Sequence, residues 1–167
     1  MSERRRAISQ CARINAPATV VWQTIAAPGN LVACHPFCKD NPVIRWSGAT
    51  SVDEVHYLNG IVYERRFRDW HENRGYDLEI FHKDRALARV SWRITPDDHE
   101  LSTLTITVDP AGLQQRSPLV RWFAHYFVIR PKMRSYLSSV LRGFKWYIEK
   151  GEAVPRNKFG EHPWFSA

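Results

Sequence analysis

The sequence has few cysteines and no long apolar run. It holds three cysteines, Cys11, Cys34 and Cys38, in 167 residues. A small, odd number of thiols argues against a disulfide framework and is typical of a reducing compartment. The polar, basic residues 1–6 are not followed by an apolar signal-peptide core, and no stretch reaches the ~18 apolar residues that a membrane span requires. We therefore expect a cytoplasmic protein without a membrane-spanning helix.

The short motifs of several common chemistries are also absent. The sequence contains no Gly-x-Ser-x-Gly nucleophile elbow, no glycine-rich phosphate loop and no zinc-finger spacing. The net charge of +7 favours acidic ligands or anionic lipid surfaces. Because no Lys/Arg block is interleaved with glycine and aromatic residues, we expect no nucleic-acid partner. The residues alone identify no catalytic group and no cofactor.

Aromatic residues, in contrast, are plentiful. They make up 13% of the chain and include seven tryptophans, while hydrophobic residues reach 44%. The length suffices for one domain with a substantial core. So many large rings suit such a core, and they also suit a cavity for an apolar ligand.

The segment from Pro131 to Lys150 has the periodicity of a long amphipathic helix. Its apolar residues fall on one face: Met133, Tyr136, Leu137, Val140, Leu141, Phe144, Tyr147 and Ile148. Gly151 stands where a left-handed C-terminal cap is expected. A face this broad needs a broad partner, and the preceding residues predict a sheet.

Most of that preceding region reads as strands joined by short turns. One strand is expected at residues 7–14, followed by two short helices before residue 38. Six further strands are predicted at 43–47, 52–58, 61–68, 76–82, 85–95 and 101–108, with turns at Asn59-Gly60, Lys83-Asp84 and Pro96-Asp98. Sequential strands joined by such short links pair antiparallel.

This order of elements resembles the START-like helix-grip superfamily (SRPBCC), and within it the polyketide cyclase/dehydrase and lipid-transport group. The residues that carry the resemblance are the Ala-Pro and Val-Trp pairs within Ala16–Trp22, the Asn59-Gly60 hairpin and the aromatic-rich C-terminal helix. The resemblance covers about residues 7–150. It implies an α+β fold, in which a strongly bent antiparallel sheet of about seven strands wraps round the C-terminal helix.

The domain organisation follows from these elements. Residues 1–151 are expected to form a single helix-grip domain. The tail, residues 152–167, contains Phe159, Trp164 and Phe165, so we expect it to dock on that domain. Residues 119–129 are apolar almost all round and predict an extra helix at about 118–130. Its basic flanks suit contact with an anionic membrane, whereas burial against the sheet or in a homodimer interface fits its apolar surface equally well.

The resemblance implies a ligand cavity between sheet and helix. A two-residue turn at Asn59-Gly60 would pair His56 with Tyr63 and Glu54 with Arg65, on the face that also carries Phe67. We assign this more apolar face to the cavity. The alternative is that Glu54–Arg65, with Asp53–Arg66 behind it, are ordinary cross-strand ion pairs.

The run from Cys34 to Cys38 contains two thiols and one imidazole, which are ligands that zinc prefers. A structural zinc site needs a fourth ligand, and none stands at a recognisable spacing, so we predict no metal. We expect a loop at the cavity mouth, with His35 and Phe37 lining it. A buried, hydrogen-bonded His35 is an equally good interpretation.

The C-terminal helix supplies further candidates. Glycine in a helix interior costs about 1 kcal/mol relative to alanine, so Gly143 should make room for a sheet side chain or for the ligand. The full set of predicted ligand-binding residues is His35, Phe37, His56, Tyr63, Arg65, Phe67, Tyr76, Trp92, Tyr136, Val140 and Gly143.

The leading functional hypothesis is binding or transport of a hydrophobic or amphipathic small molecule. A polyketide cyclase or aromatase that steers its substrate with polar pocket residues is the first alternative. A protein-binding adaptor with a filled cavity is the second. Fold alone does not decide among them.

Overall fold

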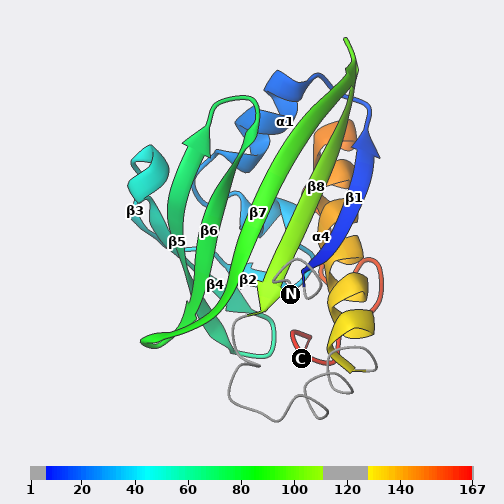
Figure 1. Ribbon diagram of the computed structural model, residues 1–167. Coiled ribbons are helices and arrows are strands. Elements are labelled where there is room, and N and C mark those ends of the chain that lie inside the picture. The colour runs from blue at the N-terminus through cyan, green and yellow to red at the C-terminus, as the bar shows by residue number, and fades with distance from the viewer. Residues whose placement is uncertain (1–6, 111–127, 167) are drawn as a thin grey trace.

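A bent antiparallel sheet packed against one long helix dominates the computed structural model (Figure 1), which describes residues 7–110 and 128–166. The strands are β1 (Ile8–Ile14), β2 (Cys38–Asp40), β3 (Val43–Arg45), β4 (Val52–Tyr57), β5 (Val62–His71), β6 (Gly75–His82), β7 (Arg85–Asp98) and β8 (Leu101–Pro110). The helices are α1 (Ala18–Ile25), α2 (Leu31–Cys34), the short 3-10 helix η2 (Gly48–Thr50) and α4 (Arg130–Lys150). The α+β class, the long helix and the two short helices after the first strand are confirmed.

The sheet has one continuous antiparallel path. Its strand order is β1-β8-β7-β6-β5-β4-β2, and β3 pairs separately with β4. The long meander β4 to β8 therefore follows sequence order, as short turns require. Strand β2 was not predicted, because only residues 38–40 pair and so short a segment shows no alternation.

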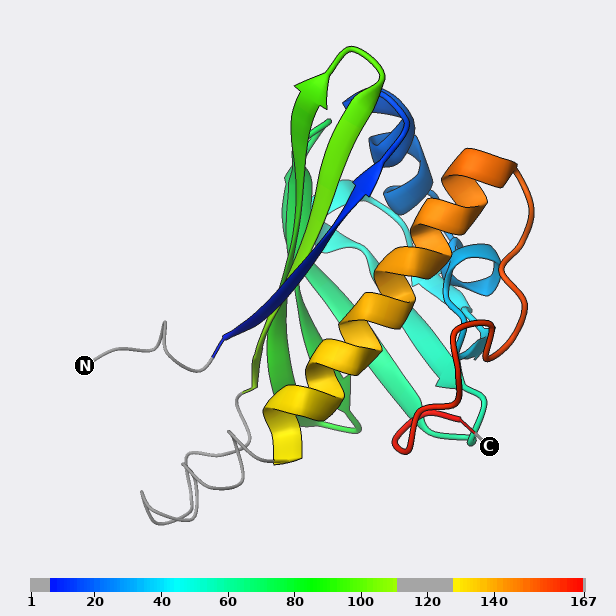
Figure 2. The ribbon, with the colours of Figure 1, turned by 90° about the vertical axis from the view of Figure 1, so that its right-hand side faces the viewer.

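Helix α4 lies across the concave side of the sheet (Figure 2). Its buried residues include Leu137, Val140, Leu141 and Phe144, which belong to the predicted apolar face. The helix ends as predicted: Gly151 adopts a left-handed conformation with φ 72°, and its N–H donates to the carbonyl of Tyr147 at 2.8 Å. The α4 face and the concave sheet face together bury the core.

The register of the β4–β5 hairpin differs from the prediction by one residue. Val55 pairs with Tyr63 and Asp53 with Arg65, and the N–H of Tyr57 donates to the carbonyl of Ile61. The loop therefore has three residues, 58–60, of which Gly60 alone has a positive φ, 86°. That is the geometry of a type I turn followed by a left-handed residue, whereas the predicted two-residue turn needs both Asn59 and Gly60 at positive φ.

This shift exchanges the two faces of β4, because strand side chains alternate with a period of two. Asp53, Val55 and Tyr57 are buried on the concave side. His56, which was predicted to face the cavity, lies on the outer side with Glu54. The predicted cross-strand pairs Glu54–Arg65 and Asp53–Arg66 are therefore wrong: Asp53 pairs with Arg65, and Arg66 contacts Glu64.

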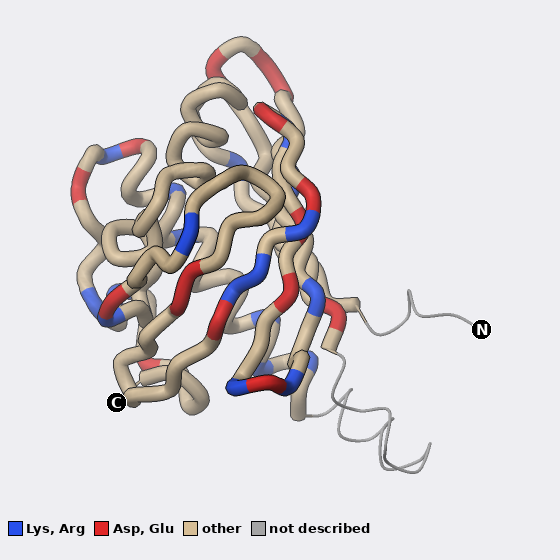
Figure 3. The backbone as a smooth tube through the Cα atoms, turned by 90° about the vertical axis from the view of Figure 1, so that its left-hand side faces the viewer, with Lys and Arg blue, Asp and Glu red and all other residues tan. Residues whose placement is uncertain are grey.

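The turn between β7 and β8 also lies later than predicted. Strand β7 continues through Pro96 to Asp98, with a register irregularity between those two residues, and the turn is at His99 and Glu100. A proline is tolerated there because a bulge removes the need for its N–H in the ladder. Basic and acidic residues both occur along the strands (Figure 3), and ion pairs such as Arg68–Glu79 join neighbouring strands.

The tail runs back along α4. The N–H of Val154 donates to the carbonyl of Ala33 at 2.8 Å, and the N–H of Asn157 donates to that of Pro36 at 3.0 Å. Phe165, near the end of the tail, is buried. Within residues 7–110 and 128–166, no helix is long and apolar enough to cross a membrane. The helix predicted at about 118–130 falls mainly on residues 111–127, outside the described residues, so its role stays a prediction.

Candidate functional site

A cavity of about 230 Å³ lies between the concave sheet face and α4. Its wall is built almost entirely from aliphatic and aromatic side chains, which strands β4 to β8 and α4 project inward at alternate or helically spaced positions. The apolar members are Leu31, Val55, Leu78, Ile80, Leu87, Ala88, Val90, Trp92, Ile106, Val108, Pro110, Met133, Leu137, Val140, Trp164 and Phe165. The polar members are His35, Tyr57, Tyr63, Arg65 and Tyr136.

The tail forms part of the cavity wall through Trp164 and Phe165. Phe165 stacks on Tyr57 with ring centroids 4.2 Å apart, and it lies 4.6 Å from the ring of Tyr136. The side-chain amide of Asn59, at the tip of the β4–β5 hairpin, donates to the carbonyl of Trp164 at 2.7 Å. The tail is thereby fixed to both the hairpin and α4, and its aromatic residues form part of the cavity wall.

Three polar side chains of the wall form a hydrogen-bonded chain. His35 Nε2 and the hydroxyl of Tyr136 are 2.9 Å apart, and the hydroxyls of Tyr136 and Tyr57 are also 2.9 Å apart. Each comes from a different element: the loop after α2, helix α4 and strand β4. Polar groups this deeply buried are stable only when they are hydrogen-bonded, so the chain fixes their positions.

Burial sets the protonation of this chain. Desolvation, assisted by the positive charge of Arg65, lowers the pKa of His35 to about 3. Desolvation also raises the pKa of Tyr136 and of Tyr57 well above the ordinary tyrosine value. All three groups are therefore neutral near pH 7 and act as hydrogen-bonding groups.

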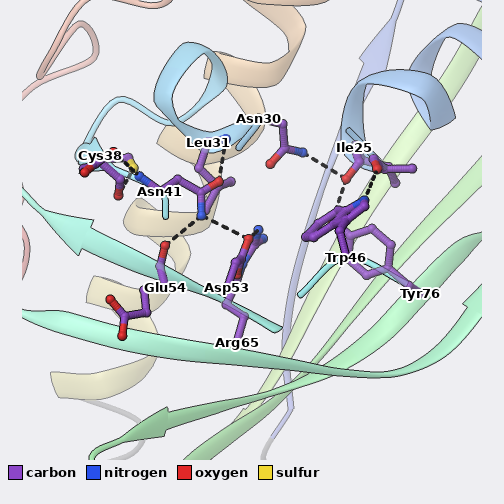
Figure 4. Close-up of polar contacts among 12 residues, drawn as sticks. Ile25, Asn30, Leu31, Cys38, Asn41, Trp46, Asp53, Glu54, Arg65 and Tyr76 are labelled. Carbon is purple, nitrogen blue, oxygen red and sulfur yellow. Dashed lines mark hydrogen bonds and ion pairs between the residues drawn. The ribbon is translucent and has the colours of Figure 1, made fainter. Parts of the chain in front are cut away.

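Arg65 lines the cavity, but its charge is already neutralised. Its Nε donates to Asp53 Oδ1 at 2.7 Å, and its Nη2 donates to Asp53 Oδ2 (Figure 4). Asn41 donates to the same carboxylate at 3.0 Å and accepts from the N–H of Leu31. Burial alone would lower the pKa of Arg65, but the Asp53 carboxylate outweighs burial and raises it above its usual range.

The structure brings together six of the eleven predicted ligand-binding residues. The cavity is lined by His35, Tyr63, Arg65, Trp92, Tyr136 and Val140. Five predicted residues do not line it: Phe37, His56, Phe67, Tyr76 and Gly143. They lie behind the wall or on the outer face.

The reasons differ among these five residues. His56 lies on the outer sheet face, 2.7 Å from Glu54 Oε2, because of the hairpin register. Phe37 is buried behind Tyr136, with parallel rings at 6.0 Å. Phe67 and Tyr76 contact each other in an aromatic cluster with Trp46 and Trp70.

The space beside Gly143 is filled by the loop after α2. It holds neither a ligand cavity nor a sheet side chain. A Cβ at this position would lie 2.2 Å from the carbonyl oxygen of Cys34 and 2.9 Å from Cδ of Pro36. The glycine therefore lets the loop after α2 approach α4. That loop carries His35, so the glycine positions a cavity residue without touching the cavity.

Sequence reasoning missed Tyr57 and the tail residues Trp164 and Phe165. Tyr57 alternates with His56, so the predicted hairpin register, which placed His56 on the cavity face, placed Tyr57 on the outer face. A three-residue loop ending in glycine would have placed it correctly, since Gly60 suits the left-handed position of either turn. No periodic signal in the tail shows where its aromatic rings bind.

Within the part of the chain that the structure describes, no group of three or more His, Cys, Asp and Glu side chains is arranged to hold a metal ion. Cys34 and Cys38 are both buried, and burial raises the pKa of each thiol to about 12. Metal binding needs thiolates, so these environments oppose it. The Cys34–Cys38 run packs the α2 loop against the core.

Comparisons with known proteins give structural relatives only. No protein-family model matches the sequence, and no curated protein sequence matches it. Among solved structures, DynU16, a protein from the dynemicin biosynthetic locus, is similar with a TM-score of 0.67 at 13% identity, over 89% of this chain and 49% of that protein. This chain thus spans about half of DynU16.

Two further relatives match over nearly their whole length. The Zhui aromatase/cyclase from Streptomyces sp. R1128 has a TM-score of 0.60 at 19% identity, over 89% of this chain and 99% of that one. The Aha1 dimer from Colwellia psychrerythraea has a TM-score of 0.62 at 11% identity, over 87% and 97% of the two chains. Together with the bent sheet that grips α4, these similarities show that the chain has the helix-grip fold, as the sequence resemblance implied.

Proposed function

We propose that the protein binds a hydrophobic or amphipathic small molecule in the cavity between the sheet and α4. The cavity itself carries the proposal: among the described residues, its wall is apolar except for five side chains. Ligand sites typically combine such a wall with a few fixed polar groups that orient the ligand. A volume of about 230 Å³ suits a compact ligand, or the apolar part of a longer one.

Enzymatic cyclisation is the second candidate, and the likeness to the Zhui aromatase/cyclase supports it. General acid–base catalysis needs a group whose pKa lies near the working pH. The pKa of His35 is about 3, and those of Tyr57 and Tyr136 lie above the ordinary value, so none of them meets this condition. These environments favour binding over acid–base catalysis. An open cavity likewise favours a small-molecule ligand over the adaptor role.

Ligand binding can be tested by filling the cavity. Ala88 on β7 lines it, so Ala88→Trp should occlude it, whereas Ala86, two residues earlier, is exposed and does not line it. With the fluorescent probe N-phenyl-1-naphthylamine, we expect saturable binding to the wild type. Ala88→Trp should bind at least tenfold more weakly, and Ala86→Trp should bind like the wild type.

Native mass spectrometry of the purified protein identifies any retained molecule. A retained lipid would support transport, and a retained aromatic polyketide would support the cyclase alternative. Absence of saturable probe binding to the wild type, or equal binding by Ala88→Trp, would overturn the proposal that this cavity is the binding site.

A further inference from the structure

The chain His35–Tyr136–Tyr57 has a defined direction. The backbone N–H of Phe37 donates to His35 Nδ1 at 3.2 Å. Nδ1 is therefore the acceptor of the neutral imidazole, and the ring proton is on Nε2. His35 Nε2–H then donates to the hydroxyl oxygen of Tyr136.

The direction continues to Tyr57. Because Tyr136 accepts from His35, its own proton is free to donate to the oxygen of Tyr57, 2.9 Å away. Either hydroxyl can donate in this pair, and the direction set by His35 leaves the proton of Tyr57 over. With Tyr136 donating, residues 7–110 and 128–166 supply no further acceptor for that proton, although Tyr57 is only 5% exposed. A buried donor without an acceptor is unfavourable, so this hydroxyl calls for a partner from the cavity.

We propose that the Tyr57 hydroxyl donates a hydrogen bond to a carbonyl oxygen of the ligand, so that the cavity selects apolar ketones over hydrocarbons of the same shape. The inference rests on the proposed binding function and specifies the class of ligand. Tyr57 is the binding group. Tyr136 and His35 are positioning residues that hold its proton toward the cavity.

An uncharged carbonyl fits better than a carboxylate. The one charged side chain among the described wall residues is Arg65, and it is engaged by Asp53 through two hydrogen bonds. A buried carboxylate without a free cation is strongly unfavourable. A ketone oxygen needs one donor and no counter-charge. Each donor in the chain also polarises the next, which strengthens the terminal one.

Tyr63 is the competing donor. It lines the same cavity, is half-buried, and its ring lies 5.5 Å from that of Tyr57. None of the described residues hydrogen-bonds to the Tyr63 hydroxyl. It therefore lacks the fixed direction that the His35–Tyr136 hydrogen bonds give to Tyr57. Changing each tyrosine to phenylalanine therefore separates the two.

The test compares two probes that differ in one oxygen, 1-tetralone and tetralin. Their affinities for the full chain are measured by calorimetry, and the carbonyl stretch of bound 1-tetralone is measured by infrared spectroscopy. For the wild type we expect about fivefold tighter binding of the ketone and a shift of the stretch to lower frequency. Tyr57→Phe should abolish both effects, because the two probes then meet a wall without the directed hydroxyl.

The remaining variants test the roles within the chain. Tyr136→Phe should keep part of the carbonyl shift, since Tyr57 remains but is no longer directed. Tyr63→Phe should keep both the ketone preference and the shift. Loss of these effects in Tyr63→Phe instead of Tyr57→Phe would overturn the assignment.

Two outcomes for the wild type separate this inference from the proposed function. If tetralin binds and the ketone binds no better, water satisfies Tyr57 and the inference fails while the binding function stands. If neither probe binds, both fail. Tetralin affinity also reports, for every variant, whether the cavity is intact.

Discussion

Asp53 and Arg65 form an ion pair that is almost completely removed from solvent, with side-chain exposures of 0% and 5%. Removing one partner of such a pair leaves an uncompensated buried charge. Asp53→Asn should therefore lower the free energy of unfolding by roughly 3–5 kcal/mol. Urea denaturation followed by tryptophan fluorescence measures this loss.

The matched control is an exposed ion pair on the same sheet. Arg68 and Glu79 have side-chain exposures of 52% and 22%. Solvent screens such a pair, so Glu79→Gln should cost less than about 1 kcal/mol. Equal losses in the two variants would show that burial does not set the strength of the Asp53–Arg65 pair.

Gly143 is required by the contact between α4 and the α2 loop. A methyl group there would collide with the Cys34 carbonyl, so helix or loop must shift. Although alanine favours helices, Gly143→Ala should cost roughly 1–3 kcal/mol, the usual range for overpacking. Thermal unfolding measures the loss, with Ser138→Ala on the exposed face of α4 as a control expected to change little. A stabilised Gly143→Ala would contradict the contact.

His35 makes the free energy of unfolding depend on pH. Its pKa is about 3 in the folded state and near 6.5 without burial, so between these pH values the unfolded chain binds a proton that the folded protein does not. Stability therefore falls as pH decreases through this window, by roughly 3 kcal/mol between pH 7 and pH 4. His35→Gln, which cannot titrate, should remove that part of the pH dependence.

The comparison is made on the difference between the two proteins, because His162 also contributes. Burial lowers the pKa of His162 as well, so it destabilises in the same direction in both proteins. If unfolding free energies of wild type and His35→Gln remain parallel from pH 7 to pH 4, His35 is not the titrating group.

At the scale of elements, the tail is part of the cavity wall. Phe165 is buried against Tyr57, Tyr136 and His162. Phe165→Ala should cost roughly 3–5 kcal/mol, as for other large-to-small core changes, and should speed dissociation of N-phenyl-1-naphthylamine. Stopped-flow fluorescence measures the dissociation rate.

Phe159→Ala is the control from the same segment. Its ring is half-buried and packs under the guanidinium of Arg142 at 4.2 Å, away from the cavity. The free energy of unfolding should fall by roughly 0.5–1 kcal/mol, the range of an exposed cation–π contact. The dissociation rate of N-phenyl-1-naphthylamine should not change. Equal effects in the two variants would mean that the tail is not part of the cavity wall.

The β4–β5 hairpin shows what sequence could and could not predict at this scale. Alternation located both strands and the turn, because burial on one face leaves a period of two. Alternation does not determine the length of the loop, because Asn59-Gly60 fits either a two-residue or a three-residue loop. Because the loop is one residue longer than predicted, Tyr57 lies in the cavity wall and His56 does not.

At the scale of the molecule, the meander and α4 were predictable because their periodicities reflect one shared core. The resemblance added their arrangement in space. The cavity was harder to predict, because its wall combines residues from β4 to β8, α4, the α2 loop and the tail. Five candidates came from correctly assigned strand and helix faces and His35 came from the predicted loop, whereas Trp164 and Phe165 reach the cavity through non-periodic contacts.

A wall drawn from so many elements couples ligand binding to the stability of the whole fold. A ligand that binds only the folded state at 100 times its Kd stabilises it by about 2.7 kcal/mol. For a chain of this length, that raises Tm by roughly 5–10 °C. We expect such a shift with 1-tetralone for the wild type and for Ala86→Trp, and none for the occluded Ala88→Trp, as measured by differential scanning calorimetry. A similar shift in Ala88→Trp would place the ligand outside the cavity, since that variant leaves the outer surface unchanged.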